Sequence, residues 1–360
     1  MIKYIGSKRL LVPWIADVVT AISGITQEKV FADLFSGSAR VAHALKARGF
    51  YVVANDLYHY AFTLAKALVE ADGRKYPKER IEGILEELSQ LPPKRGWFTQ
   101  TYCEEARFFQ PKNGERIEAI REGIEERYGE DPTLKAILLT SLILAADKVD
   151  STTGVQMAYL KKWAPRSYND LRLEYPPLLP GEGLALLGDA VEVAGEVEAD
   201  ILYLDPPYNQ HSYLGNYHVW ETLALWDRPK TYGVARKRED VRHRKSPFNS
   251  KRSAKEALAR LLSKAQAHHV LLSFSNEGFL GTEDIEELLK EWGYVLRLSR
   301  RHKRYVGALI GVYNPKGEKV GTVSHTENTE FLFVATRNRR VYQHLSSLLE
   351  GSAILPRREV

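Results

Sequence analysis

The sequence predicts an α/β protein with a doubly wound sheet, an antiparallel terminal hairpin and an inserted, mostly helical domain. Three observations support this fold class. Short apolar runs alternate with amphipathic helical patterns in the first 60 residues and again after residue 182, as in sheets with helices on both faces. Four of these runs end in an aspartate. Between residues 61 and 182 the apolar residues instead recur at helical spacing.

Size and composition limit the class of protein. With 360 residues, of which 44% are hydrophobic, the chain is long enough for about two domains. A formal net charge of +5 and a pI near 9.0 favour a polyanionic partner, although an ordinary basic protein has the same balance. The single cysteine, Cys103, excludes an internal disulfide and a cysteine zinc cluster. We expect a cytoplasmic protein without a membrane partner, because no signal peptide is evident and the longest apolar stretch is shorter than the roughly 20 residues that span a bilayer.

The chain opens with two patterns that suit anion or cofactor binding. Gly6, Ser7 and Lys8 precede an amphipathic run, which would place backbone amides and a lysine on an anion; a helix cap with a solvated lysine is the alternative. Residues 30–35 are then predicted to form a strand and residues 39–48 a helix. The turn of small residues between them lets a cofactor approach the backbone, although tight packing alone would also explain it. The three-glycine dinucleotide spacing and the Walker lysine are absent.

A second predicted strand, residues 51–54, leads to Asn55 and Asp56. Asp56 lies about 20 residues after the glycine turn, which is the usual position of a carboxylate that binds ribose hydroxyls; a helix N-cap is the alternative. The helical stretch that follows, residues 61–182, is interpreted as an inserted lobe. Its aromatic side chains between residues 97 and 109 are expected to form a core rather than stacking platforms.

The central motif is the tetrapeptide Asp205-Pro206-Pro207-Tyr208, which follows an apolar run, residues 199–204, that is typical of a buried parallel strand. In open α/β sheets, ligands bind beyond the carboxyl ends of such strands. The aspartate and the proline carbonyls accept hydrogen bonds, and the tyrosine offers a flat stacking face. The tetrapeptide therefore suits a planar substrate that bears an amino group; an ordinary strand-ending turn is the alternative.

A densely basic segment, residues 228–255, follows the tetrapeptide and contains few apolar residues. Such a segment is typical of a loop that contacts phosphates, with a solvated charged loop as the alternative. The candidates for phosphate contact are Arg236, Lys237, Arg238, Arg242, Arg244 and Lys245. Further strands are predicted at residues 269–274, 294–298, 306–312 and 329–335, with a turn at residues 314–317.

The four acids that end predicted strands are expected to share one site, because the carboxyl ends of parallel strands meet at one edge of the sheet. They are Asp33, Asp56, Asp189 and Asp205. With this ordered set, the sequence resembles the adenine-specific DNA methyltransferases that use S-adenosylmethionine, in the alpha group that includes bacterial Dam and modification enzymes of FokI type. The resemblance covers most of the chain and implies a Rossmann-like methyltransferase sheet.

The resemblance implies roles for particular residues. Contacts with S-adenosylmethionine are implied for an N-terminal motif, for the small-residue loop, and for two acids near the ribose and the adenine of the cofactor. These cofactor residues are Tyr4, Lys8, Asp33, Phe35, Ser36, Gly37, Asp56 and Asp189. The implied catalytic residues are Asp205, Pro206 and Tyr208.

The resemblance also implies a mechanism. Asp205 and the carbonyl of Pro206 would accept the two hydrogens of the 6-amino group of adenine and so aim its lone pair at the methyl group. The adenine would have to leave the duplex stack, and Tyr208 would stack on it. No metal site is expected, because no histidine shows zinc-ligand spacing.

The expected catalytic domain comprises residues 1–60 and 183–340, with residues 61–182 as an inserted target-recognition lobe and residues 341–360 as a tail. The implied partner is duplex DNA, and a cognate restriction endonuclease would belong to the same restriction-modification system. Candidates for DNA contact in the lobe are Lys161, Lys162 and Arg166. The alternatives are an amino methyltransferase that acts on RNA or on protein glutamine, and a non-catalytic nucleic-acid-binding protein.

Overall fold

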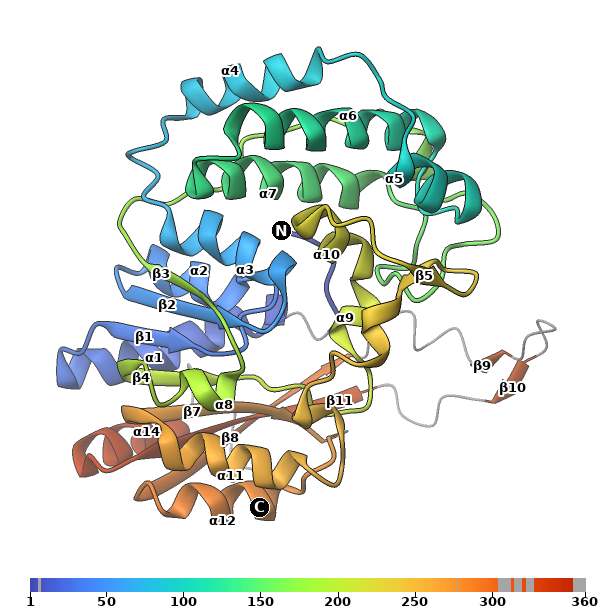
Figure 1. The fold of residues 1–360 in the computed structure, drawn as a ribbon. Helices are drawn as coiled ribbons and strands as arrows, with labels where there is room; N and C mark the ends of the chain where they lie inside the picture. Colours follow the sequence, from blue (N-terminus) through green and yellow to red (C-terminus); the bar gives the residue numbers. More distant parts are fainter. Residues whose placement is uncertain (6–7, 277, 304–311, 314–318, 322–326, 352–360) are drawn as a thin grey trace.

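The computed structural model describes residues 1–5, 8–276, 278–303, 312–313, 319–321 and 327–351 (Figure 1). Gly6 and Ser7 of the N-terminal motif and the expected turn at residues 314–317 lie outside the described residues. Within the described part of the chain, no helix is long and apolar enough to cross a membrane.

One seven-stranded sheet forms the centre of the molecule, with the strand order β3-β2-β1-β4-β7-β11-β8. The first five strands in this order run parallel, and β11 pairs antiparallel with both β7 and β8. The bounds are β1 Val30–Asp33, β2 Tyr51–Asp56, β3 Leu184–Leu187, β4 Glu198–Leu204, β7 Gln266–Ser275, β8 Tyr294–Lys303 and β11 Glu327–Thr336. The expected doubly wound sheet with an antiparallel terminal hairpin is therefore confirmed.

The terminal hairpin is built from other residues than expected. The long strands β8 and β11 form it, whereas residues 306–312 were expected to supply a strand. Only the end of that expected strand is described: β9 (Val312–Tyr313) pairs with β10 (Lys319–Gly321) in a separate two-stranded ribbon. The pairing of the hairpin was not predictable, because short apolar runs do not show which partner they pair with.

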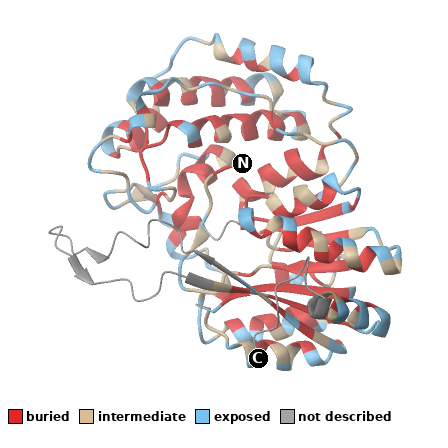
Figure 2. Ribbon diagram, turned by 180° about the vertical axis from the view of Figure 1, so that it is seen from behind, coloured by how far each residue is buried: buried red, intermediate tan, exposed pale blue. Residues whose placement is uncertain are grey.

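Helices cover both faces of the sheet, because both faces of the central strands are apolar. In β4, Ile201 and Tyr203 face one core, and Leu202 and Leu204 face the other. The first core includes α1 (Val12–Thr26), α2 (Arg40–Ala47), α3 (His59–Ala65) and α14 (Arg339–Gly351). The second includes α8 (Ala190–Val193), α11 (Ala254–Lys264) and α12 (Thr282–Lys290). Figure 2 shows the buried residues concentrated in this sandwich and in the helices above it.

The stretch from residue 61 to 182 is mostly helical, as expected, but it shares its core with the sheet domain. The expected boundary at residue 61 lies inside α3, which packs on the sheet and continues into the π-helix η2 (Lys66–Glu70). The main lobe helices are α4 (Lys78–Ser89), α6 (Pro111–Tyr128) and α7 (Pro132–Val149), and the shorter elements are α5 (Trp97–Thr99), η3 (Gln100–Glu105) and η4 (Pro165–Tyr168). The side chains of α7 join the same apolar cluster as those of α1 and α3.

The lobe aromatics are buried, as expected. Phe98, Tyr102 and Phe109 are fully buried, and they pack toward α10 (His218–Leu225), which follows the tetrapeptide loop. The rings of Phe109 and Trp220, for example, have their centroids 6.2 Å apart. The lobe is thus fixed to the segment that leads away from the tetrapeptide. The expected tail boundary at residue 341 falls within α14, where Val341 is fully buried.

Candidate active site

A cavity lies at the carboxyl edge of the sheet, at the point between β1 and β4 where the strand order reverses. Its empty volume is about 820 Å³, including space open to solvent. All the residues expected to contact the cofactor line it: Tyr4, Lys8, Asp33, Phe35, Ser36, Gly37, Asp56 and Asp189. Asp205 lines the same cavity, so the small-residue loop and the acid of the tetrapeptide share one space.

The turn after β1 requires glycine at its centre. Gly37 has a φ of +51°, which disfavours residues with a side chain. A Cβ atom at this position would lie 3.0 Å from the ring of Tyr4. The Gly37 amide donates to Asp56 Oδ2 at 2.8 Å, and the Ser36 amide donates to the carbonyl of Asn55 at 2.9 Å. The turn is therefore held against the end of β2.

Asn55, which the sequence did not single out, fixes the loops around the cavity. Its side-chain amide donates to the carbonyls of Leu34 and Gly188, at 3.1 and 3.0 Å. It thereby joins the ends of β1, β2 and β3. The neighbouring Asp56 also accepts from the amide of Tyr58 at 3.1 Å. Because Tyr58 is itself the N-cap of α3, Asp56 does not fill the capping role that was the alternative for it.

The acids of the cavity differ in their environments. Asp189 Oδ1 accepts from the Val191 amide at 2.8 Å and caps the short helix α8. Burial raises the pKa of Asp56 to about 6, against the opposing effect of the backbone amides that it accepts from. Burial raises the pKa of Asp33 well above its usual range, and the nearby Asp205 raises it further. A concentration of buried carboxyl groups favours a ligand that carries positive charge.

Lys8 lines the cavity together with the small-residue loop, and it also pairs with the tetrapeptide. Its Nζ is 3.2 Å from Asp205 Oδ1 and 3.2 Å from Glu330 Oε2 of β11. Burial alone lowers the pKa of the Lys8 ammonium, but the carboxylates of Asp205 and Glu330 outweigh it and hold that pKa well above its usual range. Lys8 is thus a fixed cation that orients the Asp205 carboxylate.

The tetrapeptide itself has two environments. Asp205 and Pro207 line the cavity, whereas Pro206 is buried and Tyr208 packs against Phe274 with ring centroids 5.3 Å apart. Burial raises the pKa of Asp205 to about 6; Lys8 opposes this rise and Glu330 adds to it. Asp205 is therefore a carboxylate near neutral pH, with one oxygen held by Lys8.

Three tyrosine rings cluster at one side of the cavity, and two of them, Tyr4 and Tyr213, line it. The ring of Tyr4 stacks against those of Tyr213 and Tyr217, at centroid distances of 5.2 and 4.6 Å. The Tyr4 hydroxyl lies 3.1 Å from the hydroxyl of Tyr60. The N-terminal segment, residues 1–5, is therefore joined to the loop after the tetrapeptide by the aromatic side chain of Tyr4.

The basic segment, residues 228–255, folds back beside the cavity. Ser246 and Phe248 line the cavity, and Phe248 packs edge-to-face on Phe35 at 5.2 Å. The Asn249 side chain donates to the carbonyls of Asn209 and His211, at 2.9 and 3.0 Å. The segment, which includes β5 (Thr231–Tyr232) and β6 (Lys237–Arg238), is therefore attached to the loop that follows Tyr208 and leads into α9 (Tyr213–Asn216) (Figure 1).

The structure divides the basic candidates into two groups. Arg238 is 2% exposed and pairs with Asp227 and Asp240, so the expectation that it contacts phosphate is wrong for this conformation. Arg244 pairs with Glu221 and Asp240, and Arg236 pairs with Glu105. Lys237 is half-buried. Arg242 and Lys245 are exposed, and neither has an ion-pair partner among the described residues.

The lobe candidates divide in the same way. Lys161 and Lys162 are exposed. Arg166 instead pairs with the buried Asp150 at 2.7 Å, in a cluster that also contains Lys3. Arg166 therefore helps to hold the lobe onto the N-terminal segment, which its sequence context did not indicate.

Several residues of the site were not singled out by the sequence analysis, among them Glu330, Tyr213 and Phe248. Glu330 directly precedes the apolar residues 331–335 of β11, and a charge beside such a run is a signal of a buried pair. Tyr213 belongs to an aromatic-rich loop, which could have been assigned to the site. Phe248 is the one large apolar residue between residues 242 and 253, and that isolation was its only signal.

Comparison with known proteins decides the class. The family model of the D12 class N6 adenine-specific DNA methyltransferases matches residues 4–275, which span the cavity and the tetrapeptide. The chain belongs to this family. The protein is therefore an enzyme of DNA adenine methylation. The alternative assignments, to methyltransferases of RNA or protein glutamine or to a non-catalytic nucleic-acid-binding protein, are excluded.

Curated relatives of this D12 methyltransferase agree with the assignment. It is 31% identical to the type II methyltransferase M.NlaIII of Neisseria lactamica over 343 residues, covering 92% of this chain and 97% of the relative. It is 33% identical to the modification methylase StsI of Streptococcus sanguinis and 32% identical to M.FokI of Planomicrobium okeanokoites, over 81% of this chain in each case. The chain spans 46% and 47% of the lengths of these last two.

The Gly37 turn gives a test of the cavity wall. Gly37→Ala should lower the free energy of unfolding by about 1–2 kcal/mol, because alanine disfavours a positive φ and its Cβ would press on Tyr4. The matched control is Gly24→Ala in α1, where no atom lies within 4 Å of the added Cβ and alanine should stabilise the helix by about 0.5–1 kcal/mol. Chemical denaturation of both variants measures the effect. Wild-type stability of Gly37→Ala would contradict the account of the turn.

Proposed function

We propose that this D12 methyltransferase transfers the methyl group of S-adenosylmethionine to the 6-amino nitrogen of a flipped adenine at a specific site in duplex DNA. The observation that carries the proposal is the shared cavity. Asp205, the acid of the tetrapeptide, lines the same space as Asp33, Asp56 and Gly37 of the cofactor-type loops. A methyl donor and an amino acceptor held there would lie side by side.

The residues of the cavity fit S-adenosylmethionine. The buried Ser36 Oγ has no hydrogen-bond partner within the described part of the chain, so it is available to a ligand. Asp56 would hold the ribose hydroxyls, Asp189 the adenine edge, and Asp33 the positively charged ammonium group. When bound, the cofactor supplies an electrophilic methyl group on a sulfonium. The acidic lining suits such a cationic ligand.

Asp205 would activate the acceptor nitrogen. The 6-amino nitrogen of adenine is a poor nucleophile because its lone pair is shared with the ring. Asp205 and the carbonyl oxygen of Pro206 would accept hydrogen bonds from its two N–H groups and so localise the lone pair on the nitrogen. The methyl group would pass directly to the nitrogen, with no covalent intermediate on the protein. Because Lys8 holds Asp205 Oδ1, the second carboxylate oxygen is the one that would face the amino group. Tyr208, fixed against Phe274, would stack on the flipped base.

The DNA would lie along the carboxyl edge. Arg242 and Lys245 of the basic segment are our candidates for phosphate contact, since both are exposed and the segment is attached beside the cavity. In the lobe, residues 61–182, Lys161 and Lys162 are the candidates, and we assign target recognition to this lobe. The names of the relatives are those of type II methyltransferases and modification methylases. We therefore propose a modification enzyme, with a cognate restriction endonuclease, that acts on DNA in the cytoplasm.

Removing the carboxylate of Asp205 tests the proposed function. Asp205→Ala should lower methyl transfer to adenine in duplex DNA at least about 100-fold, because one of two hydrogen-bond acceptors is lost from the amino group. Binding of S-adenosylmethionine, measured by calorimetry, should persist. The matched control is Asp17→Ala, an exposed acid paired with Arg48, which should keep wild-type transfer. Wild-type turnover by Asp205→Ala would eliminate the catalytic assignment.

The pH profile tests the pairing of Asp205 with Lys8. A raised carboxyl pKa favours the protonated form, and the mechanism needs the carboxylate, so kcat/KM should fall as the pH drops through about 6. Lys8→Met removes the cation that lowers the pKa of Asp205, so this acid limb should move to higher pH. Lys8→Arg keeps the charge and should keep the limb near its original pH. If the acid limb of the pH profile lies at the same pH in Lys8→Met as in the wild type, the ionisation of Asp205 does not determine that limb.

Salt dependence tests the basic segment. The double variant Arg242→Ala/Lys245→Ala should weaken DNA binding and reduce the slope of log K against log salt by about two, since each phosphate contact contributes roughly 0.9. The control is Arg260→Ala/Lys290→Ala, which removes two exposed cations from α11 and α12. Fluorescence anisotropy at several salt concentrations gives both slopes. Equal slopes for the two double variants would remove the segment from the DNA interface.

A further inference from the structure

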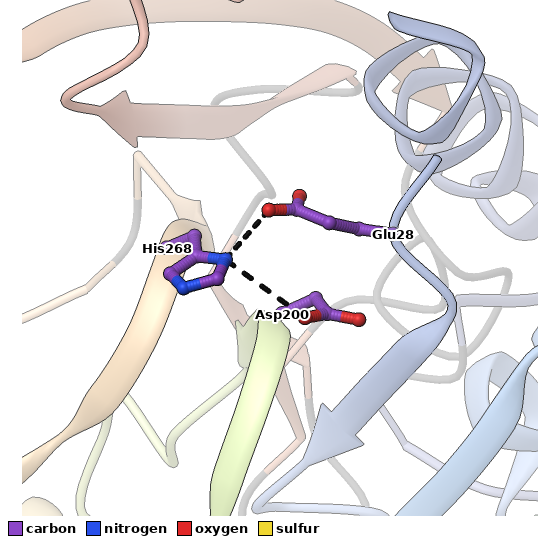
Figure 3. A group of neighbouring side chains, drawn as sticks. All are labelled: Glu28, Asp200 and His268. Carbon is purple, nitrogen blue, oxygen red and sulfur yellow. Dashed lines mark hydrogen bonds and ion pairs between the residues drawn. The ribbon is translucent and has the colours of Figure 1, made fainter. Parts of the chain in front are cut away.

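Three side chains from distant parts of the chain converge at the edge of the sheet opposite the cavity (Figure 3). Glu28 lies in the loop before β1, Asp200 near the start of β4, and His268 near the start of β7. His268 Nδ1 is 2.6 Å from Glu28 Oε1 and 3.8 Å from Asp200 Oδ1. One potential ligand atom from each side chain lies within 4.8 Å of the other two.

The second oxygen of each carboxylate already has a partner. Asp200 Oδ2 accepts from the amides of Lys29 and Val30, at 2.9 and 2.7 Å. Glu28 Oε2 lies 2.8 Å from Nε2 of His269, which is buried. His269 Nδ1 in turn lies 2.8 Å from the Thr336 hydroxyl. Both carboxylates are thus held in place through one oxygen, which leaves Glu28 Oε1 and Asp200 Oδ1 directed at His268.

We propose that Glu28, Asp200 and His268 bind one divalent metal ion of the Zn²⁺ type. Imidazole nitrogen and carboxylate oxygen are both ligands of Zn²⁺, whereas Mg²⁺ and Ca²⁺ prefer oxygen ligands alone. With bonds of about 2.1 Å, tetrahedral ligand atoms lie roughly 3.4 Å apart. The distances of 2.6 and 3.8 Å bracket that separation. The side chain of His268 is 67% exposed, which leaves a fourth position open to water.

The surrounding contacts resemble the support that metal ligands receive in proteins. Ligating carboxylates are oriented by outer hydrogen bonds and charged partners. Here the pair His269 and Thr336 holds Glu28, and two backbone amides hold Asp200. The ion would join the starts of β4 and β7 to the loop before β1. Two of its ligands, Glu28 and His268, lie 240 positions apart in the chain. It would therefore oppose separation of the strand ends and stabilise the folded state.

The metal site is separate from the proposed chemistry. Asp200 and Asp205 are five positions apart along β4, which corresponds to about 16 Å of extended strand. Binding of Zn²⁺ should therefore change stability and leave methyl transfer unchanged. The proposal does not depend on the proposed function, and a failure of either leaves the other standing.

The test uses the full chain after treatment with a chelator. Calorimetric titration with ZnCl₂ should show one ion per chain, and CoCl₂ should give the visible absorption of a tetrahedral site. At a hundredfold excess of Zn²⁺ over its Kd, the unfolding midpoint should rise by roughly 4 °C. His268→Ala should weaken binding at least about tenfold, whereas His344→Ala, which removes an exposed histidine of α14, should not.

A second variant keeps the test decisive if His268→Ala loses stability. Glu28→Gln removes one ligand charge and retains a polar partner for His269, and it should also weaken Zn²⁺ binding. Binding that survives both variants would place the ion elsewhere and overturn the proposal. If the wild-type chain binds no Zn²⁺ stoichiometrically, the cluster is an ion-pair network only.

Discussion

The buried pairing of Lys8 with Asp205 and Glu330 is the interaction on which the rest of the site depends. It joins the N-terminal segment, the central strand and the terminal hairpin, across as many as 322 positions of sequence. Two carboxylates and one ammonium in a buried setting are stable only together, because loss of one partner of a buried pair costs about 3–5 kcal/mol. The cation also leaves one oxygen of Asp205 directed away from it. The stability of the fold and the proposed chemistry therefore both require Lys8, Asp205 and Glu330 to stay paired.

The two edges of the sheet have different roles: the carboxyl edge forms the cavity, and the amino edge holds the starts of the strands together. At the carboxyl edge, Asn55, Gly37 and Asp56 hold three loops close enough to form one cavity. At the amino edge, Asp200 holds the start of β1 through two amides and stands beside His268. The lobe adds a third connection, since its aromatics pack on α10 behind the tetrapeptide loop. Chemistry and support are thus placed at opposite ends of the same strands.

Much of the site was predictable from the sequence because its residues follow strands. The acids Asp33, Asp56 and Asp205 end apolar runs, and parallel strands bring their carboxyl ends together. The partner of Lys8 was not predictable, because β11 inserts between β7 and β8 and brings Glu330 near Asp205. The density of charge in residues 228–255 predicted exposure, but it did not reveal that Arg238 pairs with Asp240 of the segment and with the preceding Asp227. No sequence signal marks where the lobe begins, because the helical pattern runs without a break from α3 into η2.

The most direct test of the central claim is transfer of labelled methyl from S-adenosylmethionine to unmethylated duplex DNA, followed by digestion to nucleosides. The account predicts label in 6-methyladenine and in no other nucleoside. Label in a different nucleoside, or no label in DNA despite measurable binding of S-adenosylmethionine, would contradict it.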